Sequence, residues 1–245
     1  KSIKDQKYLQ NRSILNKILG KKKLLNFIGL STDTRTIKKG NLFLAIKGKK
    51  IDGNKFINVA LKKGAGCIIS TKALKKNNKK IINIKNAISF LNSFAKFKRE
   101  LSFAKIIAVT GSAGKTSLKN LIRDLLRNFG KTCSSSKSFN NHLGVPISLS
   151  NLSFDDKFGV FEVGMSRPGE IKKLSRLIRP HIGVITNIGE AHIENFRNVY
   201  GIAKAKSEII ESISEGGTII LNRDDKFFDY LSKKAKLYKL KILTF

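Results

Sequence analysis

The 245-residue sequence has few cysteines and no long apolar run, and each absence excludes a class of protein. Its two cysteines, Cys67 and Cys133, lie far apart, with no second cysteine or histidine at metal-ligand spacing. Neither a disulfide framework nor a zinc site is therefore expected. No apolar run approaches the length of a membrane-spanning helix, and residues 1–10 lack the apolar core of a secretory signal. We expect a cytoplasmic protein that does not insert into a membrane.

Acidic residues are also scarce: 17 Asp and Glu stand against 49 Lys and Arg, which gives a formal net charge of +32. Such a charge raises the question of nucleic-acid binding. The lysines, however, occur along the whole chain and are not gathered on one helix beside stacking aromatic residues. We interpret the charge as a compositional bias of solvated positions and expect no nucleic-acid partner. The charge would still attract an anionic substrate.

A hydrophobic content of 41% is enough for one large or two modest domains. Apolar runs at 41–46 and 66–70 predict strands, and the helix predicted at 54–65 between them indicates a parallel crossover. A further helix is expected at about 87–98. The residues expected to share a face are Phe56, Val59, Ala60 and, as an optional member, Ile57 in the first helix, and Ile88, Leu91 and Phe94 or Ala95 in the second. We place a domain boundary near 98–105, which gives domains 1–101 and 102–245.

From residue 102 onward, apolar runs alternate with amphipathic stretches. Strands are predicted at 105–110, 158–164, 182–188 and 217–222, and helices at 117–130, 169–180 and 201–213. This alternation predicts an α/β fold: a small N-terminal α/β domain followed by a P-loop-type, mostly parallel sheet with helices on both faces. In such sheets, ligands bind beyond the carboxyl ends of the strands.

The first predicted strand of that sheet leads into the stretch Ile106–Ile122, IIAVTGSAGKTSLKNLI. A glycine turn that opens a helix lets backbone N–H groups and the helix dipole converge on a phosphate. Lys115 would add a positive charge, and Thr116 or Ser117 a hydroxyl for Mg²⁺. The loop is shorter than the standard phosphate-binding loop, which would have a glycine at Val109. The alternative is an ordinary strand-to-helix turn with a solvated lysine.

Polar residues follow the next two strands as well. Glu162 is flanked by apolar residues, and a carboxylate there needs a cation or an ion pair with a lysine. Asn187, Glu190 and His192 follow the third strand; His192 is a candidate metal ligand or, alternatively, a hydrogen-bonded core histidine. His181 follows a proline at a strand start, away from this edge, and has no expected role.

Two further segments suggest chemistry without deciding it. The loop Ser138–Pro146, SFNNHLGVP, has adjacent amides at Asn140 and Asn141 that either read a substrate or satisfy their own turn, and its Gly and Pro are expected to form a turn. Lys206 is expected near the N-terminus of its helix, where the dipole disfavours a cation. It is therefore either solvated or chemically unusual.

These motifs, taken together, resemble the ATP-dependent Mur ligases, which add amino acids to the cell-wall precursor. The stretches that carry the resemblance are TGSAGKTS, FEVGM, TNIGEAHIENF, AKAKSEI and LNRDD, in that order. Within the family, residues 31–66 and the stretch NNHLGVP look most like the members that join D-alanyl-D-alanine to UDP-N-acetylmuramoyl-tripeptide. The resemblance extends from about Gly29 to the end of the sequence.

The resemblance implies an amide ligase of peptidoglycan precursor synthesis that uses ATP and Mg²⁺. Residues 1–101 would bind the UDP-sugar and residues 102–245 would form an ATP-binding domain. UDP-MurNAc-tripeptide and D-Ala-D-Ala would be the substrates, and the protein would be a monomer. Family members have a third domain, which we expect this chain to lack; we therefore expect that it cannot complete the ligation alone.

The resemblance also assigns residues. ATP would be held by Gly111, Ser112, Ala113, Gly114, Lys115, Thr116 and Ser117, with Asn222 and Asp225 near the adenosine. Magnesium ligands would be Thr116, Glu162, His192 and Lys206, the last as a carbamate formed with CO₂. Lys115, Lys206 and His192 would be the catalytic residues, and Thr34, Arg35, Asn140 and Asn141 would bind the nucleotide-sugar substrate.

The family uses ATP to convert a carboxylate into an acyl phosphate, which an amine then attacks. Such chemistry depends on neutralising charge more than on covalent catalysis by protein groups. The sequence accordingly shows no obvious nucleophile paired with a general base. Three alternatives remain open at this point. They are a related ligase that adds a single amino acid, a non-catalytic nucleotide-binding protein, and a basic nucleic-acid-binding module.

Overall fold

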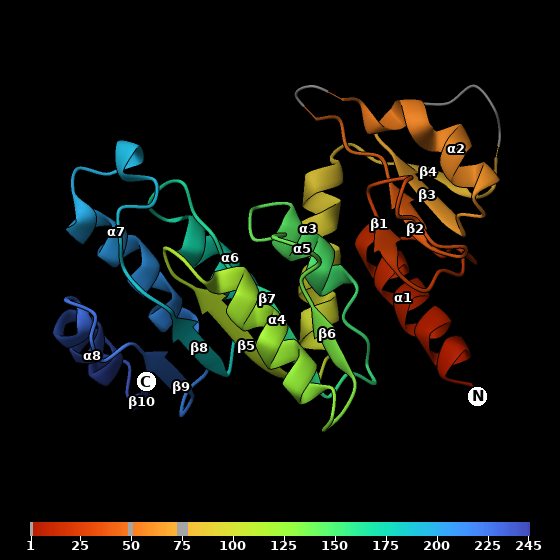
Figure 1. Cartoon of the computed structure of the whole chain (residues 1–245). Helices are drawn as coiled ribbons and strands as arrows, with labels where there is room; N and C mark the ends of the chain where they lie inside the picture. Colours follow the sequence, from red (N-terminus) through yellow and green to blue (C-terminus); the bar gives the residue numbers. More distant parts are fainter. Residues whose placement is uncertain (1, 49–50, 73–77) are drawn as a thin grey trace. The chain divides into compact units, whose positions relative to one another are not determined.

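The computed structural model describes residues 2–48, 51–72 and 78–245. The chain divides into two compact units, Lys1–Leu101 and Ser102–Phe245, and each is described by itself. Figure 1 shows the first unit from red to yellow and the second from green to blue. Among the described residues, no helix is both long enough and apolar enough to cross a membrane.

The first unit contains a parallel sheet in the order β1-β2-β3-β4. Its strands are β1 Leu30–Ser31, β2 Leu42–Leu44, β3 Cys67–Ser70 and β4 Ile81–Asn83. Its helices are α1 Ile3–Leu19, the 3₁₀ turn η1 Gly53–Phe56, α2 Ile57–Lys62 and α3 Ala87–Glu100. Because β2 and β3 are parallel and η1 and α2 connect them, the predicted crossover is confirmed.

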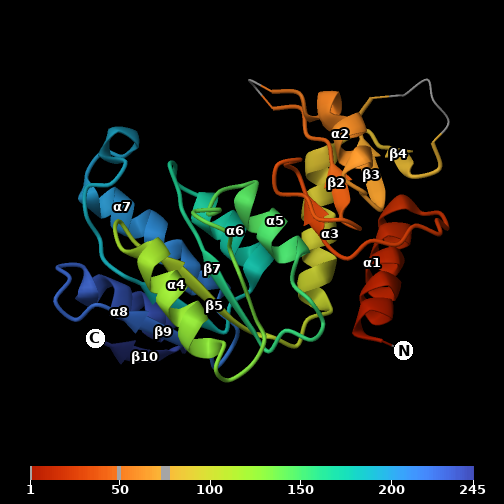
Figure 2. The ribbon, with the colours of Figure 1, turned by 45° about the vertical axis from the view of Figure 1, so that its right-hand side comes forward.

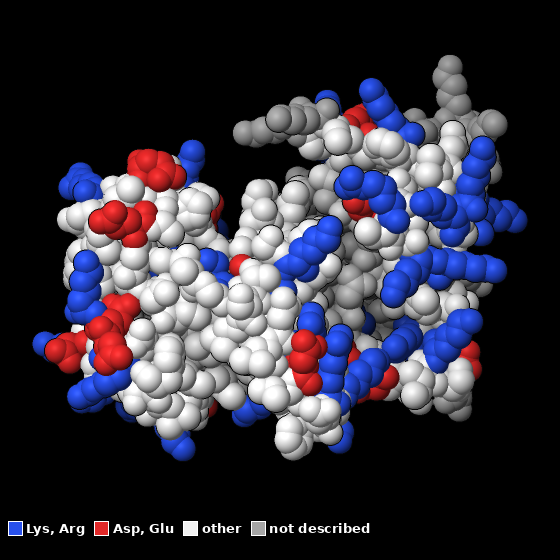
Figure 3. All heavy atoms as spheres, in the orientation of Figure 1, with Lys and Arg blue, Asp and Glu red and all other residues white. Residues whose placement is uncertain are grey.

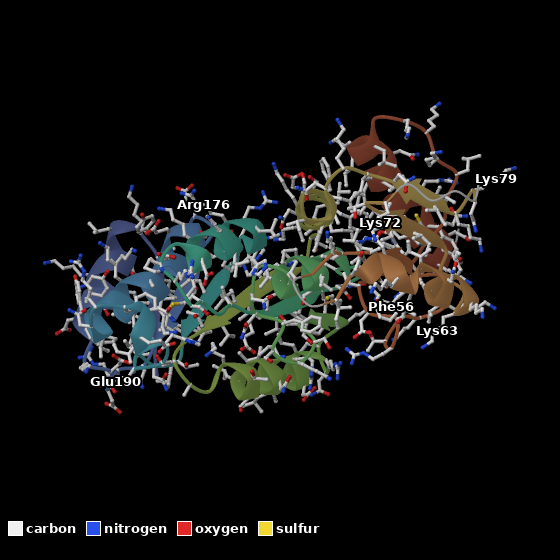
Figure 4. All side chains as sticks on the ribbon, turned by 90° about the horizontal axis from the view of Figure 1, so that it is seen from above. Phe56, Lys63, Lys72, Lys79, Arg176 and Glu190 are labelled. Carbon is white, nitrogen blue, oxygen red and sulfur yellow. The ribbon has the colours of Figure 1, made fainter. Side chains whose placement is uncertain are left out.

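The buried face of α2 differs from the prediction. Ile57 and Ala60 are buried in the core, whereas Phe56 and Val59 remain 38% and 39% exposed. The reason is that the chain forms a 3₁₀ turn up to Phe56, so the α-helical register starts only at Ile57. Figure 4 labels Phe56 at this junction.

The predicted α3 is confirmed, but α1 has no counterpart in the prediction. A capping box between Ser2 and Asp5 starts α1, and its few buried residues include Ile14 and Leu15. Polar contacts help to hold α1 on α3, because Lys98 donates to the side-chain oxygens of Gln10 (2.9 Å) and Asn11 (3.2 Å). An apolar pattern this weak gives no periodic signal in the sequence.

The second unit contains a parallel sheet in the order β10-β9-β8-β5-β7-β6, which confirms the predicted fold class. Its strands are β5 Lys105–Thr110, β6 Thr132–Ser134, β7 Phe158–Glu162, β8 Ile182–Ile185, β9 Thr218–Leu221 and β10 Lys241–Thr244. Its helical segments are α4 Lys115–Leu126, α5 Gly144–Ser150, α6 Glu170–Ile178, η2 Ile193–Asn195, α7 Val199–Lys206, η3 Ser207–Ser212 and α8 Phe228–Leu237. The prediction missed β6, α5, α8 and β10.

Helices lie on both faces of this sheet, as Figures 1 and 2 show. On one face, α4 packs on the apolar residues Ile107, Val109 and Val160. The chain runs from β5 outward to β6, and later crosses to β8 on the other side of β5. The order of the strands therefore reverses at β5, and the crevice at such a reversal is where open α/β sheets bind ligands.

Three helix boundaries change the interpretation of site residues. Helix α4 begins at Lys115, two residues earlier than predicted, so the lysine belongs to the first turn. Helix α7 ends at Lys206, which corrects the prediction that this lysine lies near a helix N-terminus. Gly144 and Pro146 lie in the first turn of α5 and do not form a separate turn, because proline fits the start of a helix.

Candidate active site

The loop between β5 and α4 has a backbone that favours glycine at two positions. Gly111 has φ +150° and Gly114, the N-cap of α4, has φ +79°. A Cβ atom at Gly111 would overlap the side-chain hydroxyl of Thr186. The first N–H groups of α4 have no partner within the helix and are available to an anion beyond β5. The ordinary solvated turn considered for this stretch does not need such tight packing.

The segment after β8 holds this loop in place. Asn187 Oδ1 accepts hydrogen bonds from the N–H groups of Ser112 (3.1 Å) and Ala113 (2.9 Å). The Thr186 hydroxyl donates to the carbonyl oxygen of Ala113 (2.6 Å), and Ser112 Oγ exchanges two hydrogen bonds with the backbone of Gly189. Asn187 had no predicted role, although its position just after a strand of the sheet was a signal in the sequence.

Two lysines meet at the carbonyl oxygen of Gly111. Lys115 Nζ donates to it at 2.8 Å, and Lys206 Nζ at 2.9 Å. Burial lowers the pKa of Lys115, against the opposing effect of the Glu162 carboxylate. Burial also lowers the pKa of Lys206 to about 7, and the nearby charge of Lys115 adds to the effect. Lys206 is only 2% exposed, so the solvated alternative for this lysine is excluded.

Glu162, at the end of β7, is 1% exposed and is held by three groups. Thr116 Oγ1 donates to Oε2 (2.7 Å), Asn140 Nδ2 donates to Oε1 (2.8 Å), and the N–H of Glu162 donates to Ser135 Oγ (3.1 Å). No lysine in the described chain lies within ion-pair distance of Glu162, so the ion-pair alternative is not observed. A carboxylate beside a hydroxyl at the phosphate loop is a donor set that suits Mg²⁺.

The remaining candidate for magnesium, His192, is separate from this group. It is half exposed in a left-handed backbone conformation, with Nδ1 3.7 Å from Glu194 Oε1. Among the described residues, no hydrogen bond or ion pair joins His192 to Glu162, and no three His, Cys, Asp or Glu side chains gather to hold a metal ion. The neighbouring Glu190 is exposed, and Figure 4 shows it at the periphery of the unit.

Asn141, Asn222 and Asp225 make hydrogen bonds within the second unit. Asn141 Oδ1 accepts from the N–H groups of Leu143 and Gly144, so it satisfies the start of α5. Asn222 Oδ1 accepts from the N–H of Asp224.

Asp225 ties its own loop to the segment that carries the phosphate-loop contacts. One carboxylate oxygen accepts from the N–H of Ile188 (2.6 Å) and the other from the N–H of Phe227 (2.9 Å).

Ser117 is exposed in the first turn of α4. The histidine given no role, His181, accepts from the N–H of Ile106 at the opposite end of β5.

The two candidates in the first unit lie on an exposed loop. Arg35 forms a two-pronged ion pair with Asp33, with a shortest distance of 2.7 Å. The carbonyl oxygen of Thr34 accepts from Lys63 Nζ (2.8 Å), and Figure 4 labels that lysine on the surface of the unit.

Comparison with known proteins agrees with the sequence motifs. The family profile "Mur ligase middle domain" matches residues 109–245, and "Mur ligase family, catalytic domain" matches residues 26–102. A curated relative, the UDP-N-acetylmuramoyl-tripeptide–D-alanyl-D-alanine ligase of Rickettsia prowazekii, is 39% identical over 198 residues. The match covers 80% of this chain and 44% of the relative.

Solved structures give the same result. MurF from Acinetobacter baumannii superposes with a TM-score of 0.80 at 28% identity, covering 97% of this chain and 52% of that one. MurF ligase from Thermotoga maritima in complex with ADP superposes with a TM-score of 0.73 at 30% identity, covering 88% and 49%. This chain therefore spans about half the length of the relatives that it matches. The matches to both units show that the chain belongs to the Mur ligase family.

Proposed function

We propose that this chain binds Mg²⁺-ATP at the carboxyl end of β5 and serves the ligation of D-Ala-D-Ala to UDP-MurNAc-tripeptide. The observation that carries the proposal is the convergence of three elements at one loop: the start of α4, the carboxylate of Glu162 and the end of α7 at Lys206. The names of the relatives supply the substrates. Because the chain spans about half of those relatives, the complete ligation is assigned to a protein that also contains their remaining half.

The residues of the loop have distinct tasks in this proposal. Lys115 and the first N–H groups of α4 bind the ATP phosphates, and Asn187 keeps the loop in the shape that presents them. Thr116 and Glu162 offer oxygen ligands to Mg²⁺, while Asn140 holds the second carboxylate oxygen. Magnesium, when bound, neutralises charge on the phosphoryl group that is transferred.

The burial and the lowered pKa of Lys206 support its assignment as a carbamate. A pKa of about 7 leaves much of this lysine neutral at physiological pH. The Nζ lone pair attacks the carbon of CO₂, the nitrogen releases a proton to solvent, and the product is an N-carboxylate. The modification replaces a buried cation beside Lys115 with an anion, so the repulsion between the two lysines becomes an attraction.

The remaining assignments rest on the resemblance. The proposal assigns His192 to a second magnesium ion, Asn222 and Asp225 to the neighbourhood of the adenosine, and Thr34, Arg35, Asn140 and Asn141 to the nucleotide-sugar peptide. Asn141 already satisfies the start of α5, which makes it the assignment most in need of a direct test.

Calorimetric titration with a non-hydrolysable Mg²⁺-ATP analogue and, separately, with UDP-MurNAc-tripeptide tests the proposal. We expect Lys115→Ala to abolish binding of the ATP analogue and to leave binding of the nucleotide-sugar unchanged. Lys105→Ala is the matched control, because it removes an equal charge at the exposed, amino end of β5. Failure of the wild-type chain to bind the ATP analogue, or equal losses in the two variants, would contradict the proposed site.

A further inference from the structure

Lys119 is a fully buried lysine one turn after Lys115 in α4, and the proposed function gives it no task. It is 0% exposed. Its Nζ donates to the carbonyl oxygens of Ser135 (2.9 Å) and Lys137 (2.6 Å). Both acceptors lie in the segment that follows β6, so this single ammonium group fastens that segment to α4.

The fastened segment has a strained backbone at one of the two acceptors. Lys137 has φ +47°, which is uncommon for a residue other than glycine and costs of order 1 kcal/mol. Such a conformation persists only where surrounding contacts determine it. The hydrogen bond from Lys119 to the carbonyl oxygen of Lys137 is such a contact.

The same segment reaches Glu162 at both of its ends. At one end, Ser135 Oγ accepts from the N–H of Glu162; at the other, Asn140 Nδ2 donates to Glu162 Oε1. Gly164 leaves room for the Asn140 side chain, because a Cβ atom there would lie 2.8 Å from its Cγ. The position of the Glu162 carboxylate thus depends on where residues 135–140 lie, and Lys119 holds that segment at Ser135 and Lys137.

We propose that Lys119 is a positioning residue of the metal site, fixing residues 135–140 on α4 so that Asn140 orients the Glu162 carboxylate toward Mg²⁺. A leucine or methionine would fill the same space at a lower desolvation cost. The two hydrogen bonds of Lys119 explain why a cation is buried here. Both acceptors are carbonyl oxygens of a segment without regular secondary structure, which an apolar side chain could not hold. The inference rests on the proposed function, because it takes Glu162 to be a magnesium ligand.

The test measures ADP binding by calorimetry with and without Mg²⁺, in the wild type and in Lys119→Met, which keeps most of the length of the side chain but removes the ammonium group. Removal of a residue that orients a metal ligand through hydrogen bonds typically weakens metal affinity by roughly 10-fold to 100-fold. We expect about a 10-fold loss of the Mg²⁺-dependent affinity and little change in metal-free binding. Lys98→Met is the matched control, because that lysine is also buried (4% exposed) but lies in the first unit.

A double-mutant cycle separates positioning from a general loss of structure. If Lys119 acts through Asn140, then adding Lys119→Met to Asn140→Ala should weaken Mg²⁺-dependent binding by less than about 2-fold beyond the single change. If the double variant instead loses affinity by the product of the two single losses, the two side chains act independently and the inference is overturned. So would a folded Lys119→Met protein with wild-type magnesium dependence.

A second variant covers the case in which Lys119→Met does not fold. Lys119→Gln is neutral but keeps an N–H donor for one of the two carbonyl oxygens, and we expect it to show a smaller loss of the same kind. Wild-type magnesium dependence in this variant would also overturn the inference. A wild-type chain that does not bind Mg²⁺-ADP at all would refute the proposed function itself, which distinguishes the two failures.

Discussion

The side-chain ammonium of Lys206 lies 2.9 Å from the carbonyl oxygen of Gly111, 95 residues earlier in the chain. This hydrogen bond joins the last residue of α7 to the first residue of the phosphate loop. It brings a second positive charge to the carbonyl group that Lys115 also binds. Two positively charged lysines that share one buried acceptor repel each other. Loss of the positive charge on Lys206 would remove this repulsion.

The pH dependence of stability should report the burial of Lys206. Its pKa is lowered to about 7 from a usual value of 10.5, so the folded state binds fewer protons than the unfolded state between these pH values. Stability contributed through Lys206 should therefore rise from pH 7 toward pH 10 and stay level below pH 7. In CO₂-free buffer, we expect Lys206→Met to be more stable than the wild type at pH 6, by roughly 2 kcal/mol, with a difference that shrinks above pH 7. Urea unfolding at a series of pH values measures this, and a difference independent of pH would contradict it.

Carbamate formation at Lys206 should be visible by ¹³C NMR after addition of ¹³C-bicarbonate. Only the neutral amine reacts, so the carbamate signal should grow between pH 6 and pH 8.5. Lys206→Arg keeps a positive charge but should give no such signal. A carbamate signal of equal size in this variant would place the reactive amine elsewhere, and no signal in the wild type would remove Lys206 from the proposed metal ligands.

Gly111→Ala should abolish binding of the Mg²⁺-ATP analogue. Its added Cβ would overlap the Thr186 hydroxyl, and φ at this position is +150°. Gly189→Ala, on the segment that contacts the same loop, is the control, because the nearest atom to its Cβ would be Ser112 Cβ at an ordinary 3.6 Å. Titration of both variants should show loss of binding only in the first. Equal affinities would mean that the loop can rearrange at no cost.

Asn141→Ala separates a structural role from substrate binding. The side chain of Asn141 satisfies two N–H groups at the start of α5, so its loss should lower the free energy of unfolding by about 1 kcal/mol. If the role is only structural, binding of UDP-MurNAc-tripeptide by the folded variant should match that of the wild type. A loss of 10-fold or more in that affinity, with stability unchanged, would instead support the substrate-binding assignment.

The phosphate loop and the parallel sheet could be predicted because their signals are local. Buried parallel strands are nearly continuous apolar runs, and the glycines, lysine and threonine of the loop are adjacent in sequence. The segments that were missed, α1, α5, α8, β6 and β10, are short, polar or partly exposed, so periodicity does not distinguish them. In α2, an initial 3₁₀ turn shifted the helical register and exchanged Phe56 for Ile57 in the core.

The amino-acid sequence was sufficient to identify the family, the α/β fold class and the residues that open the phosphate loop. The distant groups that act on that loop became visible only in the folded chain. Asn187 holds its N–H groups, Lys206 reaches its carbonyl oxygen, and Lys119 fastens the segment that carries Asn140. The physical reason is that the pKa of a lysine and the partner of a carboxylate depend on burial and on neighbours brought together by folding, and spacing along the chain encodes neither.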